Sequence, residues 1–137
     1  MLLQPKKSKY KKMQKGNLKR YKYQKHKTCM GNYCLKAVQS GLLSSKQLES
    51  ARQAIIRKIK KKGKVWLRVF PHLPVTKKPN ETRMGKGKGV VQYWVARVRG
   101  GNIIFDLAGI SHKLARSAFK TGSSKLPITI RLIPINN

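Results

Sequence analysis

The chain has 137 residues, of which 33 are lysine or arginine and 3 are aspartate or glutamate, so its formal net charge at pH 7 is +30. This length fits one domain with a modest core. Repulsion among so many positive charges opposes compaction of the chain alone, so we expect a polyanionic partner. Nucleic acid is the first candidate, because binding it releases condensed counterions. An acidic membrane surface is the other candidate polyanion. We expect no membrane span, because no apolar run approaches the roughly 20 residues that cross a bilayer. We also expect no secretory signal, because basic sequence follows the first residues at once.

The segment 1–27 contains eleven lysines and arginines and no acid. Tyr10, Tyr21 and Tyr23 lie between these cations, and no period creates an apolar face. Such a segment is predicted to be disordered alone and to order on RNA, with lysines on phosphates and tyrosines stacked on exposed bases. A merely solvated tail is the alternative. We therefore divide the chain into a basic arm at 1–27, expected to bind RNA, and one α+β domain at 28–137.

Two cysteines, Cys29 and Cys34, have the spacing C-x4-C. A structural zinc site takes four ligands, so a Cys2His2 site would need His26 and one of the distant histidines, His72 or His112. We expect instead two small, partly buried thiols in a reducing compartment, with no metal.

A short strand is expected over 29–38, followed by a break at Gly41 and a helix from Ser44. Ser44 and Gln47 have the spacing of a capping box, and Gly63 is expected to end the helix. The apolar positions fall on one helical stripe, which consists of Leu48, Ala51, Ile55 and Ile59. The opposite side carries more positive charge than the helix dipole needs, on Arg52, Arg57, Lys58, Lys60, Lys61 and Lys62.

The segment 64–70 alternates apolar and polar residues and is predicted to be a strand. Residues 71–89 contain three prolines and three glycines and are predicted to form one long loop, which in a compact domain is usually functional or disordered. Strands are expected again at 90–98 and 102–107, joined by a tight hairpin turn at the Gly100-Gly101 pair.

The stretch RMGKGKG at 83–89 alternates glycines with cations. It lacks the Ser or Thr that follows the lysine of a Walker loop, and its glycines miss the dinucleotide spacing G-x-G-x-x-G by one residue. Glycine permits positive φ and close backbone approach, while adjacent Lys and Arg neutralise phosphate. We therefore predict a bare cationic finger that inserts into folded RNA, in preference to a nucleotide-binding loop or a merely flexible surface loop.

A second helix is expected to begin at Ser111 and to end at Gly122, and a last strand to occupy 127–134. The inner face of this helix is predicted to consist of Leu114, Ala115, Ala118 and Phe119. The resulting order of elements predicts an α+β fold in two layers, with two helices packed on a mainly antiparallel sheet.

Enzymatic function is not supported by the pattern of reactive residues. Three acids, Glu49, Glu81 and Asp106, cannot easily supply both an acid–base pair and its support, and no Ser or Cys lies in a nucleophile motif. We therefore predict no enzyme and no cofactor.

Six stretches in chain order together resemble the universal large-subunit ribosomal protein sixteen family of bacteria and organelles. They cover nearly the whole chain and are highly specific in combination. They are LLQPKKSKYKKMQKG, GLLSSKQLESARQAI, GKVWLRVFPHLPVTKKP, RMGKGKG, QYWVARV and GSSKLPI. The chain departs from the family pattern in the Lys- and Tyr-rich segment 16–28 and in lacking acids around 109–119, and both departures raise its charge.

The resemblance implies a fold of α/β-hammerhead type and a structural role in the large ribosomal subunit, beside the aminoacyl-tRNA site near the peptidyl-transferase region. The implied partners are large-subunit rRNA, A-site tRNA and neighbouring large-subunit proteins. The tRNA-facing loop corresponds here to Arg83, Met84, Gly85, Lys86, Gly87, Lys88 and Gly89. The implied rRNA contacts are Lys6, Lys7, Lys9, Lys11, Lys12 and Lys15 in the arm and Arg52, Arg57, Lys60, Lys61 and Lys62 on the first helix.

The family pattern starts at the beginning of the chain, so we expect no import presequence and a chain made where it works. Its Lys-, Ile- and Asn-rich composition indicates an A/T-rich genome and favours the mitochondrial matrix, with a plastid or the bacterial cytoplasm as alternatives. The alternative function is a free basic RNA-binding or RNA-chaperone module, which would share the charge and the arm but would not need a glycine finger between strands.

Overall fold

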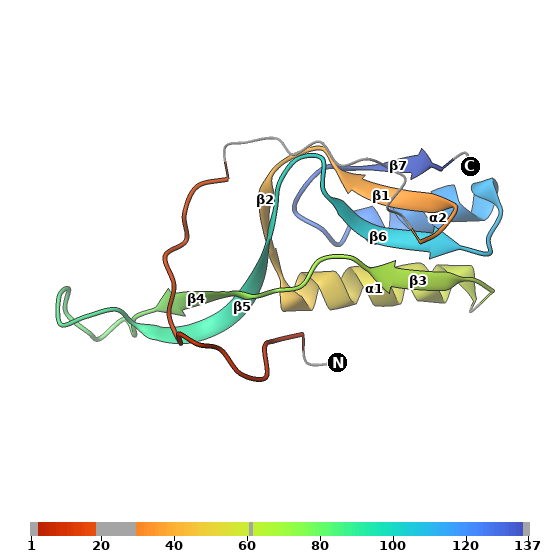
Figure 1. Ribbon diagram of the computed structural model, residues 1–137. Coiled ribbons are helices and arrows are strands. Elements are labelled where there is room, and N and C mark those ends of the chain that lie inside the picture. Colours follow the sequence, from red (N-terminus) through yellow and green to blue (C-terminus); the bar gives the residue numbers. More distant parts are fainter. Residues whose placement is uncertain (1–2, 19–29, 61, 136–137) are drawn as a thin grey trace.

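Two helices and two antiparallel sheets make up the fold (Figure 1). The computed structural model describes residues 3–18, 30–60 and 62–135. The α+β class expected from the sequence is confirmed. In chain order the elements are β1 (Tyr33–Ala37), β2 (Gly41–Ser44), α1 (Ser45–Ile59), β3 (Lys64–Leu67), β4 (Leu73–Lys77), β5 (Val90–Val98), β6 (Ile103–Ala108), α2 (His112–Ser123) and β7 (Ile130–Pro134).

The strands divide between a four-stranded sheet of order β3-β6-β1-β7 and a three-stranded sheet of order β2-β5-β4. The hairpin expected between β5 and β6 is therefore wrong, because these strands belong to different sheets. The turn itself exists, but it is tied to the β1–β2 connection: Gly101 N donates to Ala37 O at 2.7 Å, and Gly100 N donates to Ser40 Oγ at 2.8 Å. The β1–β2 and β5–β6 connections, each of which carries the chain from one sheet to the other, are thus fastened together.

The long loop expected at 71–89 is wrong in its first part, which contains β4. This strand pairs with β5 and aligns Pro74 with Trp94. Proline is tolerated there because β4 lies at the edge of the three-stranded sheet, where one side of a strand needs no ladder partner. The remaining loop, 78–89, connects β4 to β5. The short strand β2, which pairs with the other side of β5, was not predicted either.

The start of α1 agrees with the sequence, and its end does not. Ser44 Oγ accepts from Gln47 N at 3.2 Å while Ser44 N donates to Gln47 Oε1 at 2.9 Å, so the capping box is confirmed. The helix ends at Lys60, in the left-handed region at φ 54°, and not at Gly63. Gly63 is needed for packing, because a Cβ there would lie 2.5 Å from Ala108 O.

The second helix differs in the same way. Its N-cap is Ser111 as expected, although the side chain makes no capping bond. Gly122 lies inside the helix and does not end it. A Cβ at Gly122 would meet Ile55 Cγ1 at 2.6 Å, so this glycine allows α2 to approach α1 closely. The last strand, β7, is shorter than the expected 127–134.

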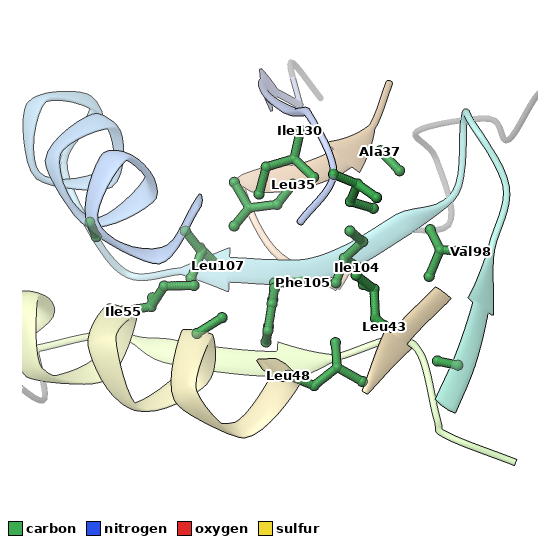
Figure 2. Packing of buried hydrophobic residues seen from close by; sticks show 14 of the residues in the cluster. Leu35, Ala37, Leu43, Leu48, Ile55, Val98, Ile104, Phe105, Leu107 and Ile130 are labelled. Carbon is green, nitrogen blue, oxygen red and sulfur yellow. The ribbon is translucent and has the colours of Figure 1, made fainter. Parts of the chain in front are cut away.

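The main hydrophobic core lies between the helices and the four-stranded sheet. Figure 2 shows Leu48 and Ile55 of α1 below Phe105 and Leu107 of β6, and all four side chains are at most 1% exposed. The predicted stripe of α1 is buried throughout. Leu3, from the arm, also packs into this cluster. No helix among the described residues combines the length and apolarity needed to cross a bilayer.

Candidate nucleic-acid interface

The loop 78–89, called the finger below, extends beyond the end of the three-stranded sheet (Figure 1). Three consecutive residues at its tip have positive φ: Gly85 at 95°, Lys86 at 50° and Gly87 at 85°. Among the described residues, nothing lies within 4 Å of a Cβ built at Gly85 or Gly87. These glycines therefore serve the backbone conformation rather than internal packing, and they leave the tip bare.

The base of the finger is held more tightly than its tip. A Cβ at Gly89 would lie 2.5 Å from Lys77 O, so glycine is required where the two strands converge. Lys78 Nζ donates to Gly85 O across the loop. Met84 stands beside this contact and is 93% exposed. Of the seven residues predicted to face tRNA, six are exposed along the projecting loop, and Gly89 is half-buried at its base.

The arm lies against the finger and binds it in both directions. Lys12 Nζ donates to Lys88 O at 2.6 Å, and Lys88 Nζ donates to Met13 O at 2.6 Å. An ammonium group has three donors, so each lysine keeps donors for phosphate. The sequence assigned Lys12 and Lys88 to different RNA partners, and the fold brings them together.

Further along, the arm is fastened to β5. Arg97 donates from a guanidinium nitrogen to Gln14 O at 2.6 Å. Gly16 lies over the same guanidinium, so that a Cβ there would come within 3.4 Å of it. Arg97 was not predicted from the sequence, because a lone arginine within a strand gives no charge run. The six arm lysines predicted to bind rRNA are all exposed.

The cations of α1 fall into two groups. Arg52 pairs with Glu49 at 2.6 Å, and hydrogen bonding to Arg52 is the main cause that lowers the pKa of Glu49 to about 2. The same bond raises the pKa of Arg52. The charge of Arg52 is therefore largely neutralised by Glu49. The i, i+3 spacing of the two residues could have indicated this pair from the sequence.

The remaining cations lie at the C-terminal end of α1. Lys61 lies outside the described residues. The other cations of this end are exposed and line a hollow of about 360 Å³ together with Leu114 of α2, and they are Arg57, Lys58, Lys60 and Lys62. Figure 1 shows this end of α1 pointing away from the finger. The candidate interface thus consists of two basic regions at opposite ends of the molecule.

In the described ranges, Asp106 and Cys34 are register partners inside the four-stranded sheet. Asp106 is fully buried, where it accepts from Met30 N at 3.1 Å and lies 3.6 Å from Arg68 Nε. Cys34 is buried in β1, whereas the partners considered for it, His26 and Cys29, lie outside the described residues. Within those described, no three His, Cys, Asp or Glu side chains gather as metal ligands would.

Comparison with known proteins agrees with this exposed, basic geometry. The model of a family described as ribosomal protein L16p/L10e matches residues 5–133. Large ribosomal subunit protein uL16 of Blochmanniella pennsylvanica is 51% identical over 133 residues, which cover 97% of this chain and 98% of the relative. The proteins of the same name from Sulfurihydrogenibium and Wigglesworthia glossinidia brevipalpis are 51% and 49% identical, each over 96% of both chains. The chain therefore belongs to the ribosomal protein L16p/L10e family.

Proposed function

We propose that the chain is a structural, non-catalytic protein of the large ribosomal subunit that binds rRNA and presents its finger to A-site tRNA. Its place as a structural constituent of the large subunit follows from family membership, since relatives matched over nearly their whole length are named as large-subunit proteins. The rRNA contacts, the tRNA contact and the absence of catalysis are the finer parts of the proposal.

The finger carries the tRNA part of the proposal. Its tip combines three positive-φ residues with open space around both glycines. Lys86 and Lys88 flank Gly87 there, and both are exposed. A backbone without side-chain bulk can approach a phosphate closely, and the lysines then neutralise its charge. These features suit a crowded RNA surface better than a pocket for a free nucleotide.

Two separate basic regions support the rRNA part. The arm supplies one, and the C-terminal end of α1 supplies the other, with its exposed cations around the hollow beside Leu114. Because the regions lie at opposite ends of the fold (Figure 1), we propose that they hold different RNA segments. We keep the division into an rRNA-binding arm, 1–27, and a single α+β domain, 28–137, as part of this proposal, with Leu3 anchoring the arm to the core.

The compartment is a further part of the proposal. The Lys-, Ile- and Asn-rich composition favours the mitochondrial matrix, whereas the named relatives are bacterial. The bacterial cytoplasm and a plastid are therefore the alternatives. Subcellular fractionation decides this point, because a mitochondrial ribosome sediments from the matrix fraction only.

Gradient sedimentation of a gentle lysate, with and without ribonuclease, tests the assignment to the ribosome. We expect stoichiometric comigration with the large subunit that survives moderate salt and is lost after ribonuclease treatment. A chain found mainly in light fractions, or removed from the subunit by modest salt, would favour the free RNA-binding or RNA-chaperone module instead.

A further inference from the structure

A groove of about 510 Å³ lies on one face of the three-stranded sheet. Val75 pairs in register with Tyr93, and Ser44 pairs with Val95. Because Tyr93 and Val95 are two residues apart on β5, the side chains of both pairs lie on the same face of the sheet. The groove, called the Tyr93 groove below, is lined by Lys15, Leu42, Ser44, Ser45, Lys46, Gln47, Val75, Gln92, Tyr93 and Val95. It is distinct from the finger, none of whose residues line it.

The arm forms one wall of the Tyr93 groove through Lys15, and hydrogen bonds attach the arm beside it. Lys15 follows Gln14, whose carbonyl accepts from Arg97, and precedes Gly16, where an added Cβ would lie 3.4 Å from the same guanidinium. Lys88 holds the preceding carbonyl, that of Met13. Because hydrogen bonds hold the carbonyls of the two residues before it, Lys15 lies at the rim of the groove as part of an attached segment.

The opposite wall is the first turn of α1, which contributes Lys46. The side chain of Gln47 is already engaged in the capping box, so Gln92 is the exposed amide of the lining. Tyr93 is 45% exposed despite its large ring. The described lining residues include two lysines and no acid. An aromatic ring with cations from two different elements beside it is the combination that binds unpaired nucleotides.

We propose that the Tyr93 groove holds one unstacked nucleotide of the large-subunit rRNA. Its base stacks on Tyr93, its flanking phosphates lie on Lys15 and Lys46, and the amide of Gln92, which is both donor and acceptor, reads the base edge. This inference rests on the proposed rRNA-binding function. The rRNA is favoured over tRNA because Lys15 belongs to the arm, whereas the finger that we assign to tRNA lies beyond the end of the sheet (Figure 1).

Ultraviolet irradiation at 254 nm of large subunits that contain the wild-type chain tests the contact directly. It joins a stacked base to an adjacent aromatic side chain without a linker, and mass spectrometry of the peptide with β5 identifies the adduct. We expect an adduct of Tyr93 with one rRNA nucleotide, formed equally with and without bound tRNA. An adduct with tRNA, or adducts in the chain only at other aromatic residues such as Tyr10, would overturn the assignment.

Binding of the full-length chain to two short single-stranded RNAs, one intact and one with a single abasic position, gives an independent test. Both RNAs keep every phosphate, so only a stacked base distinguishes them. We expect the wild-type chain and Tyr93→Phe to prefer the intact RNA by about 5- to 100-fold, and Tyr93→Ala to lose this preference. Phe70→Ala, a control at another exposed aromatic residue, keeps it.

The two proposals fail in different ways in this assay. If Tyr93→Ala keeps the wild-type preference, or if the wild-type chain shows none, the Tyr93 groove is not a nucleotide site, even when RNA binding remains strong and salt-dependent. If neither RNA binds at low salt and the chain is absent from large subunits, the rRNA-binding function fails, and the groove proposal fails with it. Tyr93→Phe separates the ring from its hydroxyl, and wild-type affinity of Tyr93→Ala for the abasic RNA shows that this variant is folded.

Discussion

Lys12 and Lys88 each use their ammonium group on the other's segment: Lys12 Nζ donates to Lys88 O, and Lys88 Nζ donates to Met13 O, both at 2.6 Å. This reciprocal pair joins the arm to the finger across more than seventy residues of sequence. Under our proposal, rRNA that fixes the arm also fixes the base of the finger, which lowers the entropy that the finger loses when it meets tRNA.

Removing Lys88 should loosen the arm, whereas removing Lys86 should not. Lys88→Ala deletes the donor to Met13, and an exposed hydrogen bond of this kind contributes about 0.5–1.5 kcal/mol. We therefore expect limited trypsin cleavage after Lys15 to become roughly two- to tenfold faster in Lys88→Ala, because the arm leaves the finger more often. Lys86→Ala is the matched control on the same finger. Equal cleavage rates in the two variants would show that the hydrogen bond from Lys88 to Met13 does not hold the arm.

The two ends of the finger should respond differently to an added methyl group. At Gly87, alanine must adopt positive φ in open space, which costs roughly 1–2 kcal/mol locally. At Gly89, whose φ is not positive, the methyl group would instead collide with Lys77 O and separate β4 from β5. We expect Gly89→Ala to lower the midpoint of urea unfolding more than Gly87→Ala does, and Gly87→Ala to weaken A-site tRNA binding. A larger loss of stability in Gly87→Ala would contradict this interpretation.

Gly122→Ala should destabilise the packing of the helices, because the new Cβ would lie 2.6 Å from Ile55 Cγ1. Overpacking of a core costs typically about 1–3 kcal/mol. Ile55→Ala creates space at the same contact, so the two changes should couple favourably in a double-mutant cycle of unfolding free energies. Strict additivity would mean that Gly122 is not the site of close helix approach.

Glu49 should stabilise the fold at neutral pH and lose this effect in acid. Its pKa falls from 4.5 to about 2 in the fold, chiefly through the hydrogen bond to Arg52. Since the folded-state pKa is the lower one, the stabilisation is complete above pH 4.5 and disappears as the pH falls towards 2. Glu49→Gln should therefore lower the unfolding free energy at pH 7 and converge with the wild type near pH 2. A constant difference between pH 6 and pH 2 would exclude this linkage.

The C-terminal end of α1 should contribute to the RNA affinity of the chain independently of the finger. Replacing Arg57, Lys58, Lys60 and Lys62 by glutamine should reduce the slope of log Kobs against log salt by about 0.7–0.9 for each phosphate that these side chains neutralise in the wild type. Combining this change with Lys86→Ala should give additive losses of affinity, because the two regions are far apart. An unchanged slope would place the end of α1 in solvent or against protein.

Local features of the sequence predicted α1 well. The capping box at Ser44 and the stripe that ends at Ile59 depend on contacts three or four residues apart, and the structure confirms both. The helix ends were misplaced because Gly63 and Gly122 serve close packing against other elements. A glycine that ends a helix and a glycine that admits a neighbouring segment look the same in one sequence.

Strand pairing and the shape of the interface depend on distant contacts and were harder to predict. Pro74 concealed β4, since its compatibility with an edge strand shows only once the sheet order is known. The Gly100-Gly101 turn looked like a hairpin, although it carries the chain from one sheet to the other. The finger was found from its alternating glycines, but its attachment to the arm and the Tyr93 groove arise only from the tertiary fold.

Site-specific photo-crosslinking from the tip of the finger tests the central claim most directly. Met84, 93% exposed, is replaced by p-benzoylphenylalanine in the full chain, and ribosomes that carry it are irradiated with and without A-site tRNA. Val38, 49% exposed and outside the finger, is the control position. We expect a crosslink from position 84 to tRNA that requires an occupied A site, and none from position 38. Crosslinks from position 84 to rRNA or protein alone, unchanged by A-site tRNA, would contradict the account.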